Sequence, residues 1–220
     1  MRSVRCRRAG WTALAGLVAL HVASAGAEGV EATLERVMQG MAGTSGVVAE
    51  FRESKELALL SAPLDSRGVL YFVPPDRLAR LTEAPSPSRL VVDGDRFFLE
   101  DATGGEALDL SSNPVAAQVV SNFIVLFNGD LEALRERYEP RFETTDAGWT
   151  LALVPRGRPL SDVVASVTLH GQGRALAKME LVETGGDKTT TWFDNVRTDV
   201  ELEPATLERV FARGDRPDAR

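Results

Sequence analysis

The alternation of apolar and polar residues divides the chain into two groups of strands with a helical stretch between them. Period-two alternation begins after Gly46 and continues through Leu59, which predicts a long first strand. Four or five antiparallel strands are expected before residue 113, the last two joined at the tight turn Asp93-Gly94-Asp95. Five more are expected after it, joined by glycine-containing turns, at residues 142–145, 149–154, 163–170, 175–183 and 189–196.

The helix between the two groups of strands has almost no polar face. Asn113 can cap its start, and Gly129 stands just past its end, where a left-handed residue is favoured. Apart from Asn128 at its last position, only Gln118, Ser121 and Asn122 are polar between them, and the spacing of these three places them on one narrow stripe. At about 1.5 Å per residue the helix is roughly 20 Å long, too short for a hydrocarbon core of about 30 Å. We therefore expect it to lie against protein or against an apolar ligand.

Three other segments have a helical pattern. Residues 29–41 carry apolar side chains on one face, so this helix either packs on the core or forms a second cover over a ligand cavity. Residues 130–138 predict a short helix with acids in its first turn, and residues 204–211 predict a last helix before a polar tail at 214–220. Meandering strands with helices in the middle and at the ends predict an α+β fold, in which a single antiparallel curved sheet carries the helices.

Several strands are apolar on both faces, which is unusual for a sheet with one face in water. In the strand that ends at Val73, residues Val69 and Tyr71 lie on one face while Leu70 and Phe72 lie on the other. A sheet that curls around the apolar helix uses this surplus. A sheet that curls incompletely leaves an apolar hollow.

The first residues have the composition of a secretory signal peptide. Four arginines within residues 2–8 precede an apolar segment at 9–23, which ends in small residues suited to cleavage near Ala25 or Ala27. We predict a signal peptide at residues 1–27 and a soluble, exported, monomeric mature protein. Removing four arginines and no acids changes the formal charge from −7 to −11. That charge argues against nucleic acid as a partner and against simple attraction to an anionic membrane.

The chain offers no convincing catalytic or metal-binding group. After the leader it has no cysteine and a single histidine, His170, which excludes disulfides, thiol catalysis and His/Cys zinc sites. Asp93 and Asp95 are explained by their hairpin turn, and Ser161 lacks the sequence of a nucleophile elbow. The glycines at 171–173 precede a strand rather than a helix, so they do not form a dinucleotide fingerprint. No enzyme activity, metal or cofactor is expected.

The segment from Ser66 to Asp101 resembles the outer-membrane lipoprotein carrier proteins, the LolA family, in the order and spacing of its features. The resemblance extends over nearly the whole mature chain. In the first half of the chain it rests on a strand with a phenylalanine (Phe51), a glycine-led strand ending in proline (Gly68–Pro74) and a hairpin before an aromatic strand (Val92-Asp93-Gly94). In the second half it rests on the apolar helix (113–129) and two glycine-led motifs (Gly129-Asp130 and Gly148–Leu151).

This resemblance implies an incomplete, half-open β-barrel at residues 28–213, with helices as a lid over an apolar cavity. It also implies a periplasmic protein that takes acylated lipoproteins, or a related envelope lipid, from an inner-membrane transporter and passes them to an outer-membrane acceptor. The residues expected to line the acyl-chain cavity and its lid are Phe51, Leu70, Phe72, Leu78, Leu90, Val92, Phe97, Leu99, Val119, Phe123, Phe127 and Trp149.

One departure from the family concerns the arginine that helps to hold the lid, which usually follows directly after the aromatic residue of the proline-led strand. Here Leu78 is followed by Ala79 and only then by Arg80. Because a one-residue offset in a strand reverses the side-chain direction, we expect Arg80 to face away from the lid.

Two other functions are compatible with the same residues. A lipid-sensing or envelope-stress module could use the same curved sheet without being a carrier. An esterase-like enzyme is a third possibility, although the sequence lacks a matching base and nucleophile.

Overall fold

The computed structural model describes residues 33–211 of the chain. The predicted signal peptide and polar tail lie outside these residues, so both stay predictions, as do the domain boundaries at 28 and 213. The description also leaves out the side chains of Val119 and Phe123, two of the predicted lid residues, and that of Val115.

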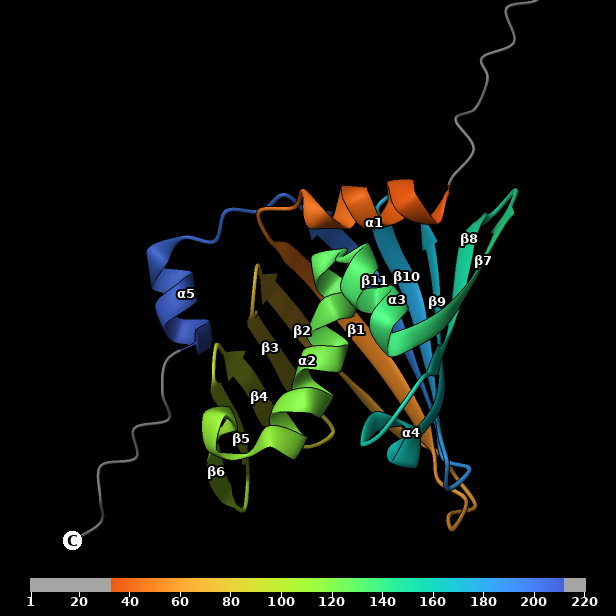
Figure 1. Cartoon of the computed structure of the whole chain (residues 1–220). Helices are drawn as coiled ribbons and strands as arrows, with labels where there is room; N and C mark the ends of the chain where they lie inside the picture. The colour runs from red at the N-terminus through yellow and green to blue at the C-terminus, as the bar shows by residue number, and fades with distance from the viewer. Residues whose placement is uncertain (1–32, 212–220) are drawn as a thin grey trace, which may run out of the picture. The chain divides into compact units, whose positions relative to one another are not determined.

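Eleven strands form one antiparallel sheet, in the spatial order β6-β5-β4-β3-β2-β1-β11-β10-β9-β8-β7 (Figure 1). Strands β6 and β7 form the two edges and do not pair with each other, so the sheet stays open. The α+β fold with a single, incompletely closed sheet is therefore confirmed. The strands are β1 (Val47–Glu56), β2 (Leu64–Val73), β3 (Arg77–Ala84), β4 (Ser88–Asp93), β5 (Arg96–Asp101), β6 (Gly104–Asp109), β7 (Tyr138–Thr145), β8 (Gly148–Pro155), β9 (Val164–Gln172), β10 (Ala175–Glu183) and β11 (Lys188–Thr198).

Helices connect the two edges of the sheet and cover its ends. The segment between β6 and β7 contains a single 3₁₀ turn and two α-helices, so the chain passes from one edge to the other across the concave side (Figure 1). Another helix precedes β1, a very short one precedes β9, and one follows β11. They are α1 (Leu34–Ala42), η1 (Leu110–Ser112), α2 (Pro114–Asn128), α3 (Leu131–Arg137), α4 (Leu160–Val163) and α5 (Pro204–Phe211).

The apolar helix α2 begins and ends where the sequence predicts. The Asn113 side chain accepts a hydrogen bond from the Ala116 backbone N–H at 3.1 Å, and Gly129 adopts a left-handed conformation with φ of 65°. A Cβ atom at Gly129 would also collide with the Met38 carbonyl oxygen of α1. Glycine is thus required here both by the backbone conformation and by the close approach of α1 to the end of α2.

Two clusters of buried apolar residues occupy the concave side of the sheet. One joins β1, β2 and β11 to α2, with Phe51, Phe72 and Ile124 among its members. The other joins β8 and β9 to α1, α2 and α3, and includes Trp149 and Leu134. Helices α1, α2 and α3 therefore pack on the inner face of the sheet, as an amphipathic or wholly apolar helix requires.

A third cluster lies on the convex side, where α5 covers the outer face of the first strands. Val210 and Phe211 of α5 pack with Ala79 and Val91, and Tyr71 and Phe98 lie against this group. Two arginines fix the end of the helix. Arg89 Nη2 donates to the Val210 carbonyl at 2.8 Å, and the Arg77 guanidinium lies 4.3 Å from the Phe211 ring centroid. The surplus of apolar strand residues is thus divided between α2 inside and α5 outside. The sequence interpretation expected it to face α2 or an apolar hollow and did not foresee the cover by α5.

Two strand predictions need correction. The first strand ends at Glu56 and not at Leu59, because residues 57–63 form a turn in which the Ala58 N–H donates to the Asp187 carboxylate at 2.9 Å. Six strands, not four or five, precede α2. The additional strand β6 has the sequence Gly-Gly-Glu-Ala-Leu-Asp, which lacks the apolar alternation that marks a strand.

Candidate ligand-binding hollow

The register of the sheet brings the predicted cavity residues of the first strands onto one face. Residues directly opposite each other in antiparallel strands point to the same side of a sheet. One row across the strands consists of Phe72, Leu78, Val92 and Phe97, and the next consists of Leu70, Arg80, Leu90 and Leu99. Phe51 shares the concave cluster with Leu70 and Phe72, so both rows face the concave side.

The predicted residues differ in how deeply they lie in this concave space, which we call the hollow. Phe51, Leu70, Phe72 and Val92 are buried, while Leu78 and Phe127 are half-buried against the cluster that contains Phe51. Towards the β6 edge the face becomes more open, since Leu90 and Phe97 are half-buried and Leu99 is exposed. Trp149 belongs to the separate cluster under α1 and α3, where its indole N–H donates to the Gly173 carbonyl at 2.9 Å.

An apolar cavity of about 50 Å³ lies in the hollow between the C-terminal half of α2, the end of α1 and strands β1, β10 and β11. Of the predicted residues, Leu70 and Phe127 line it, and Met179 and Phe193 line its far wall. The Phe127 ring lies 5.4 Å from the Phe72 ring, centroid to centroid. Pockets that hold small molecules are commonly ~300–1,000 Å³. Side chains from α2 therefore fill most of the space that a ligand would need.

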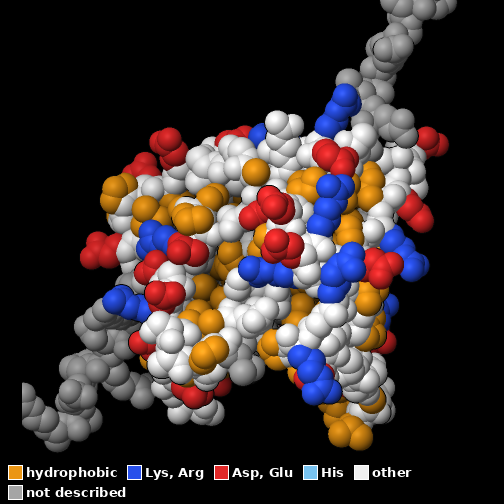
Figure 2. Space-filling view, in the orientation of Figure 1, with side chains coloured by type: hydrophobic (Ala, Val, Ile, Leu, Met, Phe, Trp, Pro, Cys, Tyr) orange, Lys and Arg blue, Asp and Glu red, His pale blue; other side chains and the backbone are white. Residues whose placement is uncertain are grey.

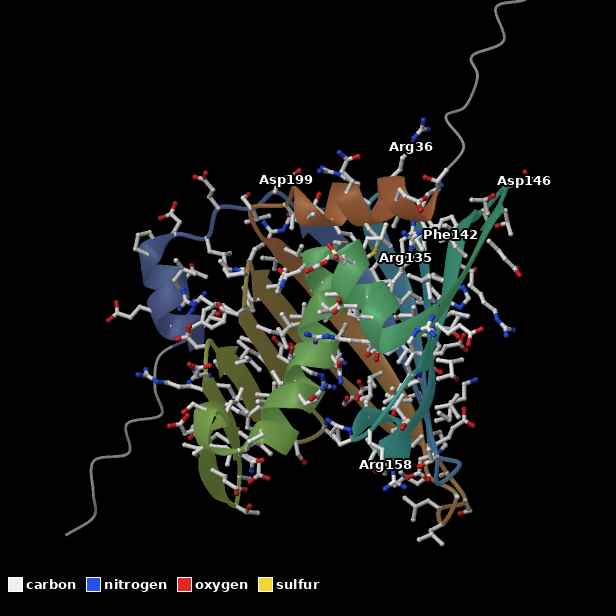
Figure 3. The ribbon with its side chains drawn as sticks, viewed as in Figure 1. Arg36, Arg135, Phe142, Asp146, Arg158 and Asp199 are labelled. Carbon is white, nitrogen blue, oxygen red and sulfur yellow. The ribbon has the colours of Figure 1, made fainter. Side chains whose placement is uncertain are left out.

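A charged group lines this cavity at the α1 end. Arg174, in the turn between β9 and β10, lines the cavity and lies directly against Gly40 of α1. Its guanidinium pairs with Asp199, which Figure 3 shows beside the end of α1. The apolar lining thus ends in an ion pair on this side.

Polar contacts hold α2 to its neighbours at Ser121 and Asn122 of the polar stripe and at Asn128, its last residue. The Arg137 guanidinium of α3 donates to Ser121 Oγ at 2.6 Å and to Asn122 Oδ1 at 3.4 Å. The Tyr138 hydroxyl donates to the Asn122 backbone oxygen at 3.2 Å, and Asn128 Nδ2 donates to the Pro75 carbonyl at 2.6 Å. Sequence reasoning identified the stripe but not the residues that bind it.

Tyr138 has the most strongly perturbed environment among these groups. Its side chain is fully buried at the start of β7, and burial raises the pKa of its phenol to about 12. The hydroxyl therefore stays protonated and able to donate to α2 at any pH at which the protein is expected to work.

Arg80 lies on the concave face, so the expectation that it faces away from the lid is wrong. It stands opposite Leu70 and Leu90, and its guanidinium lies 4.2 Å from the Phe51 ring centroid. Arg80 Nη2 donates to Glu53 Oε1 at 2.8 Å, and further hydrogen bonds go to side chains of the same sheet, Ser66 and Thr82. The arginine thus forms a polar cluster on the floor of the hollow.

His170, one of the two histidines of the chain, lies on the convex face in a hydrogen-bonded chain. His170 contacts Thr150 Oγ1 through Nδ1 at 3.1 Å and Glu180 Oε2 through Nε2 at 3.0 Å. This contact with His170, with help from Lys178 and Lys188, lowers the pKa of the Glu180 carboxyl. Within residues 33–211 there is no group of three or more His, Cys, Asp or Glu side chains placed to hold a metal ion.

The geometry defines a class of half-open barrels in which helices cross a concave apolar face. A family profile described as "Outer membrane lipoprotein carrier protein LolA-like" matches residues 24–210, and the chain therefore belongs to this family. None of the helices within residues 33–211 has the length and apolar character needed to cross a membrane.

Three solved structures with similarity to the chain have low sequence identity to it. A LolA superfamily protein of Nitrosomonas europaea is 11% identical over 80% of this chain and 97% of its own, with a TM-score of 0.42. A putative outer membrane lipoprotein-sorting protein domain of Vibrio parahaemolyticus is 12% identical over 80% and 96%, with a TM-score of 0.45. MucB of Pseudomonas aeruginosa, in its complex with MucA, is 16% identical over 79% and 58%, with a TM-score of 0.48. A search of curated protein sequences gives no match.

Proposed function

We propose that this protein is a periplasmic carrier that shelters the acyl chains of lipoproteins, or of a related envelope lipid, on their way from the inner to the outer membrane. The observation that carries the proposal is the apolar concave face with a nearly all-apolar helix seated on it. Phe51, Leu70 and Phe72 form the floor, and Phe127 of α2 occupies the space above them. Membership of the LolA-like family supports the same reading.

The small cavity has a direct consequence for how a ligand would bind. Because the cavity holds only about 50 Å³, an acyl chain must displace α2 side chains such as Phe127 to enter. Burying a large apolar side chain is worth roughly 1.5–3 kcal/mol, so ligand and helix compete for the same surface. The net affinity then stays low enough for the cargo to be handed on.

The remaining parts of the proposal rest on sequence and family. Export to the periplasm rests on the leader pattern of residues 1–27. An inner-membrane donor and an outer-membrane acceptor are proposed from the family. The binding role extends to all the predicted cavity and lid residues, including Trp149 and the two whose side chains are not described. The proposed carrier acts as a monomer without a catalytic step.

Phe127→Ala tests this function against a matched variant on the other face of the sheet. Removing the Phe127 ring opens space under α2, so a fluorescent fatty-acid probe should bind more tightly than it does to the wild type. Phe98→Ala removes a ring that packs under α5 on the convex side, and should lower stability without changing probe affinity. If neither the wild type nor Phe127→Ala binds the probe, the hollow is a closed core and the proposal fails.

Mass spectrometry of material that co-purifies from the periplasm identifies the cargo. Acylated lipoprotein is the expected result. If lipid co-purifies without lipoprotein, the result favours the alternative function, a lipid-sensing module, over the carrier.

A further inference from the structure

The turn between β1 and β2 exposes leucine side chains to an unusual degree. Leu59 is 97% exposed, Leu60 is 49% exposed and Leu64, the first residue of β2, is 52% exposed. Single exposed apolar residues are normal on protein surfaces, but neighbouring ones on a protrusion mark a contact site. Figure 2 shows hydrophobic side chains gathered at the lowest point of the view, where Figure 1 places this turn.

The turn is fixed to its neighbours, so its leucines are presented in a defined position. The Ala58 N–H donates to the Asp187 carboxylate in the β10–β11 turn at 2.9 Å. That second turn is joined to α4, since the Thr184 N–H donates to the Val163 carbonyl at 3.1 Å. Val163 is itself half exposed. We call Leu59, Leu60, Leu64 and Val163 together the leucine tip.

The leucine tip lies beyond the end of the hollow that is opposite α1. Along β1, Val47 and Ala49 line the cavity near α1, Phe51 is 1% exposed, and Glu53 follows on the same face. The side chains of Glu53 and Arg80 are 21% and 27% exposed although they face the concave side. Water therefore reaches the concave face between Phe51 and the tip, and a ligand that leaves the hollow in this direction meets the tip next.

We infer that the leucine tip docks the protein shallowly into the acyl layer of a zwitterionic membrane surface. A stable protein complex buries about 800 Å² on each partner, and four aliphatic side chains on a protrusion provide only a fraction of that. Shallow and reversible insertion into a bilayer needs less apolar surface, because its strength grows with the apolar area placed below the headgroups. The small, convex shape of the tip therefore favours a lipid surface over a protein partner.

The charges around the tip select the kind of lipid. Three basic side chains near the tip each have an acidic partner at 3.1–3.4 Å. The pairs are Lys55 with Glu183, Lys188 with Glu180, and Arg158, labelled beside α4 in Figure 3, with Asp162. With no cluster of uncompensated lysine and arginine among these residues, attraction to anionic lipids is not expected. The apolar side chains alone have to hold the protein on the membrane.

A fluorescent label at the tip tests the inference with lipid vesicles. The chain has one cysteine, Cys6, so Leu59→Cys in a Cys6→Ser background provides a single thiol for an environment-sensitive dye. With phosphatidylcholine vesicles the dye emission should rise and saturate with lipid. All variants carry the same N-terminus, so any contribution of residues 1–32 cancels between them.

Vesicle flotation with substituted tips provides the quantitative comparison. Leu59→Gln with Leu60→Gln should weaken vesicle binding on the order of tenfold or more, since two leucines no longer enter the acyl layer. Val154→Gln is the control, because Val154 is comparably exposed on β8, four strands along the sheet from β1. Its vesicle binding should equal that of the wild type.

Three outcomes would overturn the inference. They are an unchanged dye signal, equal flotation of the double variant and the wild type, and a leucine-dependent dimer in light scattering without vesicles, which would assign the tip to a second copy of the chain. The inference extends the proposed carrier function, but the vesicles contain no cargo. A negative result therefore leaves the carrier proposal standing, and fatty-acid probe binding tests that proposal separately.

Discussion

Replacing Tyr138 by phenylalanine tests whether α2 must separate from the sheet before a ligand enters. The tyrosine ring is fully buried, and its hydroxyl donates to the Asn122 backbone oxygen at 3.2 Å. Phenylalanine keeps the ring and creates no large cavity, so the change removes one buried hydrogen bond worth roughly 0.5–1.5 kcal/mol. The substitution therefore destabilises the closed position of α2 by this free energy, relative to an open position in which the hydroxyl is hydrated.

A change of this size shifts the equilibrium between closed and open α2 by roughly 2- to 12-fold. When the open form is a minor species, the apparent affinity for a ligand rises by the same factor. Tyr138→Phe should therefore unfold at a lower urea concentration, and yet bind a fluorescent fatty acid roughly 2- to 12-fold more tightly than the wild type.

Tyr71→Phe is the matched control, because the chain's other tyrosine lies on the convex side against the α5 cluster. Its probe affinity should equal that of the wild type. If Tyr138→Phe loses stability but binds the probe no more tightly, ligand entry does not require α2 to leave β7, and the reasoning is refuted.

The pH dependence of stability provides a second test of Tyr138→Phe. The pKa of Tyr138 is about 12 in the folded protein, above the ordinary value of about 10 in an unfolded chain. The unfolded state therefore loses its proton first, and stability that is complete below about pH 10 falls as the pH rises towards 12. Tyr138→Phe should lack this part of the alkaline loss when urea unfolding is compared at about pH 8 and about pH 11.

Three further substitutions, at Glu180, Arg80 and Glu53, test the polar clusters of the sheet. The pKa of Glu180 is lowered, first by His170, so its contribution to stability is present above the unfolded carboxyl pKa and is lost as the pH falls through the folded value. In Glu180→Gln the unfolding free energy, measured with urea, should therefore decrease less as the pH is lowered. The same decrease as in the wild type would contradict this. Arg80→Leu should lower the unfolding free energy by roughly 1–3 kcal/mol, because Glu53 loses a charged partner. Adding Glu53→Leu should recover part of this loss, whereas strictly additive losses in the double-mutant cycle would show that the pair is not coupled.

Local signals in the sequence were sufficient to predict the ends of α2, and the residues that the family resemblance selects on β2 to β5 lie on one face of the sheet. Asn113 and Gly129 mark the helix ends by their own hydrogen bonding and backbone conformation, which depend little on the rest of the chain. The predicted aromatic and aliphatic residues of β2 to β5 share one face because the strands pair in a simple meander. Period-two patterns and short turns are enough for such a register.

Features that the side-chain pattern does not mark, or that depend on contacts between distant segments, could not be predicted. Strand β6 is defined by backbone pairing with β5, and its side chains carry no pattern. The packing of α5 on the outer face joins Arg89 to Val210, which are 121 positions apart. Arg80 was assigned to the wrong face because its direction was deduced from an offset relative to the family, whereas it follows from pairing with Leu70 and Leu90.

The two unpaired edges of the sheet determine how its interior can change size. Strands β6 and β7 are joined through η1, α2 and α3, with no ladder of backbone hydrogen bonds between them. In a closed barrel the circumference is set by strand number and stagger, so widening it breaks hydrogen bonds. Here the two edges are not tied by a strand ladder, so moving them apart leaves every strand paired with its neighbours. The packing of α1, α2 and α3 on the inner face resists this movement, as do the hydrogen bonds from Arg137 and Tyr138 to α2. The interior can therefore widen without loss of strand pairing, up to the separation of β6 and β7 that the connection through η1, α2 and α3 can span.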